Sequence, residues 1–103
     1  MDRMSAAEFA ARRCQLGLTM AELGERLGVR QDTVKRWEAG REPVPYRVRD
    51  EVAGLAAEQG VLVRQILDAE TTVYLRRGDG WTLGAAARAL EAEPDLMLEW
   101  LDV

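Results

Sequence analysis

The fold is decided by one short stretch of the chain, in which residues 20–37 read MAELGERLGVRQDTVKRW. Thr19 precedes the stretch and Glu22 follows three residues later, so each side chain can satisfy the other residue's free backbone donor at the start of a helix. Gly28 supplies the positive φ that is favoured just beyond a helix end. A second helix is predicted over residues 31–39, after a very short connection. Two helices joined in this way must cross at a steep angle.

The point where the two helices cross tolerates only a small residue, and Gly24 occupies it. Gly28, four residues later, provides the turn between the helices. Apolar residues at helical spacing fill the space between them: Leu23, Leu27, Val29, Val34 and Trp37. These positions agree in register and predict a helix-turn-helix whose second helix turns its outer face to solvent.

Further helices are predicted on both sides of this motif. Ser5 and Glu8 form another capping box, and the helix that they start is expected to end at Gly17. Pro45 can begin a fourth helix, because backbone N–H groups in the first turn have no acceptor within the helix and the N–H that proline lacks is not needed there. Gly60 is expected to interrupt that helix, with a fifth helix following over residues 61–67.

The last third of the chain mixes strand and helix signals. Residues 71–75 are β-branched and aromatic, which predicts a short strand. Two short helices are expected over residues 82–91 and 95–101, separated by Pro94. The predicted fold is therefore mainly α. An N-terminal helix-turn-helix domain of four to five helices spans residues 1–58, and a C-terminal region with a short strand and two helices spans residues 59–103.

Composition removes several classes of chemistry. The 103 residues contain no histidine and a single cysteine, Cys14. Imidazole catalysis, imidazole metal ligation and an intrachain disulfide are therefore excluded, and we expect no enzyme, cofactor or metal site. No apolar run reaches the roughly 20 residues that span a bilayer, and the first residues lack the layout of a signal peptide, so a cytoplasmic protein is expected. Abundant alanine and a strong preference for arginine over lysine suggest a GC-rich bacterial or phage genome.

Charge is distributed unevenly along the chain. The formal net charge is −4, but residues 1–50 hold ten basic against eight acidic side chains, whereas residues 51–103 hold four against ten. A polyanion responds to the local field over about a Debye length and not to the total charge. The N-terminal half therefore suits a nucleic acid, and the acidic C-terminal half should repel one.

Several short motifs lie at consistent positions: QLGLT at residues 15–19, AEL at 21–23, LGV at 27–29 and RWEAGR at 36–41. Through them, residues 5–56 resemble the Cro/C1-type (XRE) helix-turn-helix domain. More narrowly, residues 37–41 followed by Val44-Pro45 resemble the N-terminal domain of anti-CRISPR-associated repressors, whose relatives carry an additional C-terminal region used for dimerisation. The resemblance implies double-stranded DNA as the ligand.

In such domains the first residues of the second motif helix meet base edges, so the resemblance places Gln31, Asp32 and Arg36 there. The side-chain chemistry agrees, since Arg36 can donate two hydrogen bonds to guanine O6 and N7, and Gln31 can form a bidentate pair with adenine N6 and N7. Lys35 can read a base or hold a phosphate. Asp32 has two interpretations that the sequence leaves open: it can accept from cytosine N4, or it can stabilise the helix N-terminus as an anion.

Phosphate contacts set the register on DNA without reading its sequence. The candidates for such contacts are Thr19, Arg30, Arg41 and Tyr46. Two positions depart from the family pattern, because Met20 stands where a phosphate-binding glutamine is common and Arg30 replaces the usual Ser or Thr cap. The resemblance also implies an ion pair between Arg13 and Glu38 beneath the recognition surface.

One helix-turn-helix offers only about 600–1,000 Å² of contact with DNA, so a dimer that reads two half-sites is expected. The C-terminal half is the predicted dimerisation region, since its apolar residues exceed what short elements can bury, and the strand can pair antiparallel with its twin across a two-fold axis. The residues assigned to this interface are Val73, Tyr74, Leu75, Met97, Trp100 and Leu101.

The predicted function is sequence-specific DNA binding by a dimeric transcriptional repressor, which occupies a palindromic operator near its own promoter. The alternative is an antitoxin or other interaction protein, in which the acidic C-terminal half binds a partner protein. RNA as a further ligand is left open by the sequence.

Overall fold

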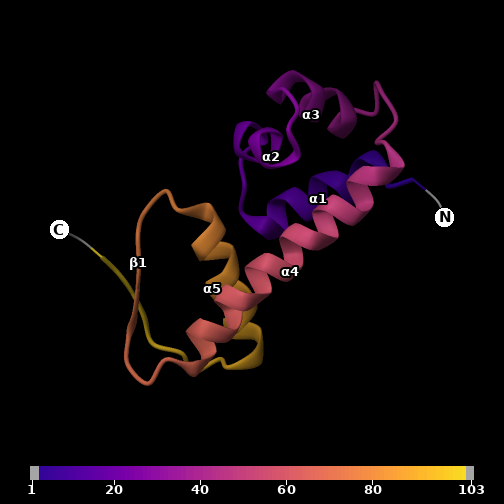
Figure 1. Cartoon of the computed structure of the whole chain (residues 1–103). Helices are drawn as coiled ribbons and strands as arrows, with labels where there is room; N and C mark the ends of the chain where they lie inside the picture. Colours follow the sequence, from indigo (N-terminus) through magenta and orange to yellow (C-terminus); the bar gives the residue numbers. More distant parts are fainter. Residues whose placement is uncertain (1–2, 102–103) are drawn as a thin grey trace.

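The computed structural model describes residues 3–101. Along the chain lie α1 (Ala6–Leu16), α2 (Met20–Leu27), α3 (Gln31–Glu38), α4 (Tyr46–Asp68), β1 (Val73–Leu75), α5 (Gly80–Ala92) and β2 (Leu98–Trp100). The first three helices gather around one end of the long helix α4, and α5 packs along the other end with β1 beyond it (Figure 1). The mainly α prediction is confirmed. Within residues 3–101, none of the helices has the length and apolar character that a bilayer crossing requires.

The predicted starts of the first two helices are confirmed by their caps, whereas Pro45, predicted as the first residue of the fourth helix, is the N-cap of α4. Both capping boxes are formed, with the Ser5 hydroxyl accepting from the Glu8 N–H at 3.0 Å and the Thr19 hydroxyl accepting from the Glu22 N–H at 3.1 Å. Gly28 follows α2 with φ 71°, in the left-handed region that glycine adopts without strain. Local sequence therefore sets these boundaries.

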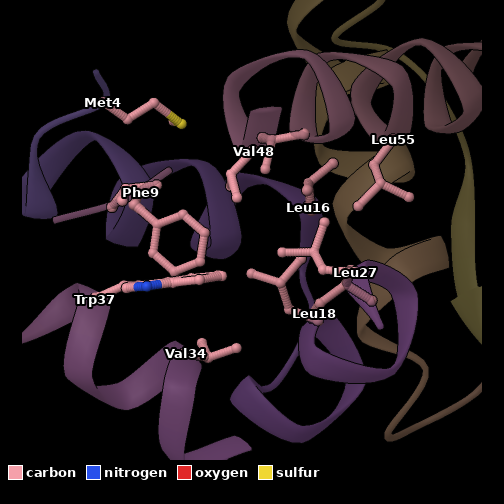
Figure 2. Close-up of a cluster of buried hydrophobic side chains, with 12 residues drawn as sticks. Met4, Phe9, Leu16, Leu18, Leu27, Val34, Trp37, Val48 and Leu55 are labelled. Atoms are coloured by element: carbon pink, nitrogen blue, oxygen red, sulfur yellow. The ribbon is translucent and has the colours of Figure 1, made fainter. Parts of the chain in front are cut away.

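One apolar core holds the N-terminal half together. The rings of Phe9 and Trp37 meet edge to face, with centroids 5.5 Å apart (Figure 2). Trp37 is buried, which confirms that it is a core residue. The core is built from Met4, Phe9, Leu16, Leu18, Leu23, Leu27, Val34, Trp37, Val44, Val48, Val52 and Leu55. It joins α1, α2, α3 and the first half of α4.

The steep crossing of α2 and α3 depends on Gly24. A Cβ at this position would lie 2.8 Å from the carbonyl oxygen of Val29, a backbone atom that cannot easily move away. The amide of Val29 in turn donates to the carbonyl of Gly24 at 2.9 Å. The predicted role of Gly24 as the small residue of the motif is confirmed.

The predicted break at Gly60 is wrong, because α4 runs without interruption from Tyr46 to Asp68. A glycine inside a helix costs only about 1 kcal/mol relative to alanine, and burial of the surrounding turns outweighs that cost. Gln59 and Ile66, on either side of Gly60, are both buried. The helix therefore also crosses the position at which we divided the chain into two regions.

The predicted helix over residues 95–101 is also wrong, since this segment contains the strand β2. Residues 98–100 pair in parallel with residues 73–75, and the Leu101 N–H donates to the Leu75 carbonyl at 2.8 Å. A seven-residue helix is marginally stable on its own. Because α5 brings this segment back beside β1, its backbone N–H and carbonyl groups can instead form hydrogen bonds with β1. The predicted strand over residues 71–75 is confirmed at 73–75, with a partner in the same chain.

A second, smaller core lies between α4, α5 and the two strands. It contains Ile66, Leu75, Ala85, Ala86 and Ala89. The three alanines share one face of α5, and their small side chains let α5 pack against α4.

The two cores are joined by a seam, by which we mean the backbone contact between Gly17 and Gly80 together with the buried side-chain amide of Gln59. Gln59 is fully buried, and its Nε2 donates to the carbonyls of Leu16 and Trp81, both at 3.0 Å. The backbones of Gly17 and Gly80 approach so closely that a Cβ on either would overlap the other's carbonyl. The end of α1 and the start of α5 are therefore in direct backbone contact.

Candidate nucleic-acid interface

Helix α3 has one buried face and one exposed face. Val34 and Trp37 point into the core, at 0% and 3% exposure. The four predicted base-contacting residues all lie exposed on α3: Gln31, Asp32, Lys35 and Arg36. The structure therefore presents them together on a surface that the rest of the helix-turn-helix leaves open to solvent.

Charged residues of α3 line a shallow groove together with the loop that follows the helix. Asp32, Lys35 and Arg36 come from the helix, and Arg41 comes from the loop. The Arg41 N–H donates to the Arg36 carbonyl at 3.0 Å, which folds the loop back against the helix end. Three basic side chains thus meet Asp32 and also Glu42 of the loop, which lies 2.9 Å from Arg36, so the local charge stays positive and favours an anionic ligand.

The start of α3 carries Arg30 at the N-cap position, and its side chain makes no capping hydrogen bond. Arg30 is exposed and stands next to the first backbone N–H groups of the helix. Asp32 lies in the first helical turn, where an anion is favoured by the helix dipole, and it is exposed. Both interpretations of Asp32 therefore remain compatible with its position.

The other two predicted phosphate contacts lie at the starts of neighbouring helices and do not line the groove. Thr19 caps α2, where its hydroxyl accepts from the Glu22 N–H. Tyr46 begins α4 and is 53% exposed, with the guanidinium of Arg3 4.8 Å from the centre of its ring. Arg3 is a cation that sequence reasoning did not place near the interface, because nothing local connects it to Tyr46.

The ion pair between Arg13 and Glu38 is formed beneath this surface. Two hydrogen bonds join the side chains, from Nε to Oε2 at 2.7 Å and from Nη2 to Oε1 at 3.0 Å, while Nη1 donates to the Leu18 carbonyl at 3.0 Å. Both side chains are largely buried, at 19% and 9% exposure. The hydrogen bond to Glu38 raises the pKa of Arg13 above its ordinary value. Arg13 therefore stays charged at every pH at which the protein is folded and functional.

Comparison with known families agrees with this geometry. Residues 9–45 match a helix-turn-helix family, a range that starts in α1 and includes α2, α3 and the loop with Arg41. Residues 9–45 are a Cro/C1-type helix-turn-helix domain. A domain of this family binds DNA, and it is typical of transcriptional regulators that have no enzymatic activity. No curated protein matches the chain.

Outside this domain, the residues assigned to a dimer interface fall into two groups. The side chains of Tyr74, Met97, Trp100 and Leu101 are exposed, at 60%, 67%, 39% and 41%. Leu75 is 5% exposed, because its side chain packs in the second core. The strand residues thus divide between the core and the surface.

The Arg13–Glu38 pair should contribute measurably to the stability of the helix-turn-helix domain. Glu38→Ala leaves a largely buried guanidinium without its partner, so we expect the free energy of unfolding to fall by about 2–4 kcal/mol. Glu58→Ala is the matched control, because Glu58 pairs with Arg26 at 3.2 Å but both side chains are well exposed. The control should lose less than about 1 kcal/mol. Urea unfolding followed by circular dichroism measures both, and equal losses would contradict the role given to Arg13.

Proposed function

We propose that the protein is a sequence-specific transcriptional repressor, which binds a palindromic operator as a homodimer and reads each half-site with α3. The observation that carries the proposal is the exposed face of α3, on which two basic side chains and an amide stand together on a rigid domain. An α-helix fits the major groove of B-DNA, where base edges present their donors and acceptors.

Within this proposal, the exposed residues of α3 divide into two roles. Arg36 and Gln31 read guanine and adenine, while Lys35 reads a base or holds a phosphate. Arg30 and Arg41 flank α3 at its two ends and hold the phosphates on either side of the groove. Thr19 and Tyr46, at the starts of α2 and α4, add contacts further along the backbone.

Dimerisation through the C-terminal sheet would bring two α3 helices to successive half-sites. Within residues 3–101 the sheet has two strands, so each strand keeps one edge without a strand partner. In a parallel pair of strands, only every second residue forms backbone hydrogen bonds with the adjacent strand. The Val73 N–H donates toward β2, so the N–H and carbonyl of Tyr74 point the other way, to the open edge of β1. Tyr74, on β1, is 60% exposed, whereas the other exposed apolar residues of the sheet lie on or next to β2. A second copy, paired across a two-fold axis at β1, would cover the side chain of Tyr74.

A dimer seated on such an operator would act by excluding other proteins from the promoter. The acidic C-terminal region would face away from DNA, consistent with its charge, while the helix-turn-helix faces the phosphates. The resemblance of residues 37–45 to anti-CRISPR-associated repressors supports regulation of the protein's own promoter.

Salt dependence tests whether phosphate contacts drive binding. On a labelled duplex of mixed sequence, the logarithm of the binding constant should fall linearly with the logarithm of salt concentration, and each phosphate contact adds about 0.9 to the slope. Arg41→Ala should reduce the slope by about 0.9. Arg64→Ala, which removes an exposed arginine from the second half of α4, should leave it unchanged. A flat salt dependence of the unmodified protein, measured by fluorescence anisotropy, would contradict DNA as the ligand.

The dimer is tested by placing a charge at the open edge of β1. Tyr74→Glu should yield a monomer in sedimentation experiments and weaken operator binding by about two orders of magnitude or more, because the second half-site is no longer engaged intramolecularly. Val61→Glu is matched to it, since Val61 is also an apolar side chain with 60% exposure but lies on α4. That control should remain dimeric. If Tyr74→Glu sediments as the unmodified protein does, the interface lies elsewhere.

A further inference from the structure

The guanidinium of Arg36 is held on one side by two contacts. Its Nε lies 2.9 Å from Glu42 Oε1, and its Nη2 donates to Thr33 Oγ1 at 3.3 Å. Thr33 is one helical turn earlier on α3, whereas Glu42 comes from the loop after the helix. Arg36 is therefore bridged between its own helix and the loop.

The two contacts involve Nε and Nη2, and neither of them uses Nη1. An arginine carries five N–H groups in a fixed plane, and Nε and Nη2 share one edge of that plane. The end edge of the plane is formed by one N–H of Nη1 and one N–H of Nη2, while the second N–H of Nη1 points back along the side chain. This end edge is a parallel pair of donors, the arrangement that guanine O6 and N7 accept.

The loop that carries Glu42 is fixed by its neighbours. Its beginning is folded against α3 by the bond from the Arg41 N–H to the Arg36 carbonyl. Its end is anchored by Val44, which is buried in the N-terminal core at 2% exposure. Pro43, between these anchors, has a restricted φ. The carboxylate of Glu42 is thus delivered to Arg36 by a short segment tied at both ends.

The pair contributes little to folding, because both side chains are about half exposed, at 44% and 48%. Exposed ion pairs add little to stability, because solvent screens them. The pair does change the charge that Arg36 presents. A guanidinium already neutralised by a carboxylate gains less from a phosphate, whereas its directional donors to a base edge are retained.

We infer that Glu42 is a positioning residue that fixes Arg36 for reading guanine and turns it away from the phosphate backbone. This inference rests on the proposed function, since it assigns the residue that makes one base contact specific. Thr33 assists from within α3. The loop after the helix, outside the part of the motif that enters the groove, thereby contributes to sequence preference.

The test uses the full chain and a library of duplex DNA with a randomised central segment, sequenced after rounds of binding. The variants are Arg36→Ala, Glu42→Ala and Glu42→Gln, with Glu91→Ala as a control that makes the same change in net charge on α5. Binding to a single duplex of mixed sequence is measured in parallel, and urea unfolding checks that each variant is folded.

We expect Arg36→Ala to abolish the preference for guanine at one position of each half-site. Glu42→Ala should lower that preference roughly threefold to tenfold, a part of what a bidentate pair supplies. It should also bind the mixed duplex more tightly, because Arg36 is released toward phosphate. Glu42→Gln keeps an acceptor for Nε, so it should recover part of the guanine preference. Glu91→Ala should resemble the unmodified protein in both measurements.

The possible failures are distinguishable. If Arg36→Ala loses the guanine preference while both Glu42 variants keep it fully, the inference about Glu42 is wrong and the proposed function stands. If the Glu42→Ala and Glu91→Ala variants gain affinity for the mixed duplex equally, the effect is one of net charge and the inference is again wrong. If the unmodified protein enriches no sequence at all, the proposed function is overturned and the inference falls with it.

Discussion

The arrangement of the N-terminal domain depends on one side chain, Arg13, which holds three segments at once. Its guanidinium donates two hydrogen bonds to Glu38 at the end of α3 and a third to the carbonyl of Leu18, which precedes α2. Because the pair is largely buried, its hydrogen bonds keep their strength and its geometry admits little variation. With the end of α3 fixed in this way, Val34 and Trp37 stay in the core and the opposite face of the helix stays exposed. The surface that we propose for DNA is therefore a consequence of a contact beneath it.

A second constraint joins this domain to the C-terminal region. Backbone contact between Gly17 and Gly80, together with the buried amide of Gln59, seats the start of α5 against the end of α1. The unbroken helix α4 runs through both regions (Figure 1). In a dimer formed through the sheet, this rigid connection would fix the spacing of the two α3 helices. Half-site spacing would then be a property of the seam and of α4.

Local signals in the sequence were sufficient to predict the helix-turn-helix. Capping boxes, the glycine at the crossing and the apolar spacing act over a few residues, and the structure confirms them. The exposed positions on α3 followed from the same periodicity. The wrong predictions of secondary structure concern segments whose conformation depends on contacts with residues distant in the sequence. Residues 95–101 become a strand because β1 lies beside them, and Gly60 stays helical because α5 covers the neighbouring turns. The contact between Arg36 and Glu42 was missed for a similar reason, since it depends on how the loop folds back on α3.

The claim that α3 forms the DNA-binding surface is tested most directly by following the backbone amides of isotope-labelled protein by nuclear magnetic resonance while a duplex of mixed sequence is added. We expect the largest changes in chemical shift at the exposed positions of residues 30–36 and at Arg41, with smaller changes at the starts of α2 and α4. Amides of α5, β1 and β2 should move little, since we propose that this acidic region faces away from the phosphates. Largest changes in the C-terminal sheet, with α3 unaffected, would contradict the claim.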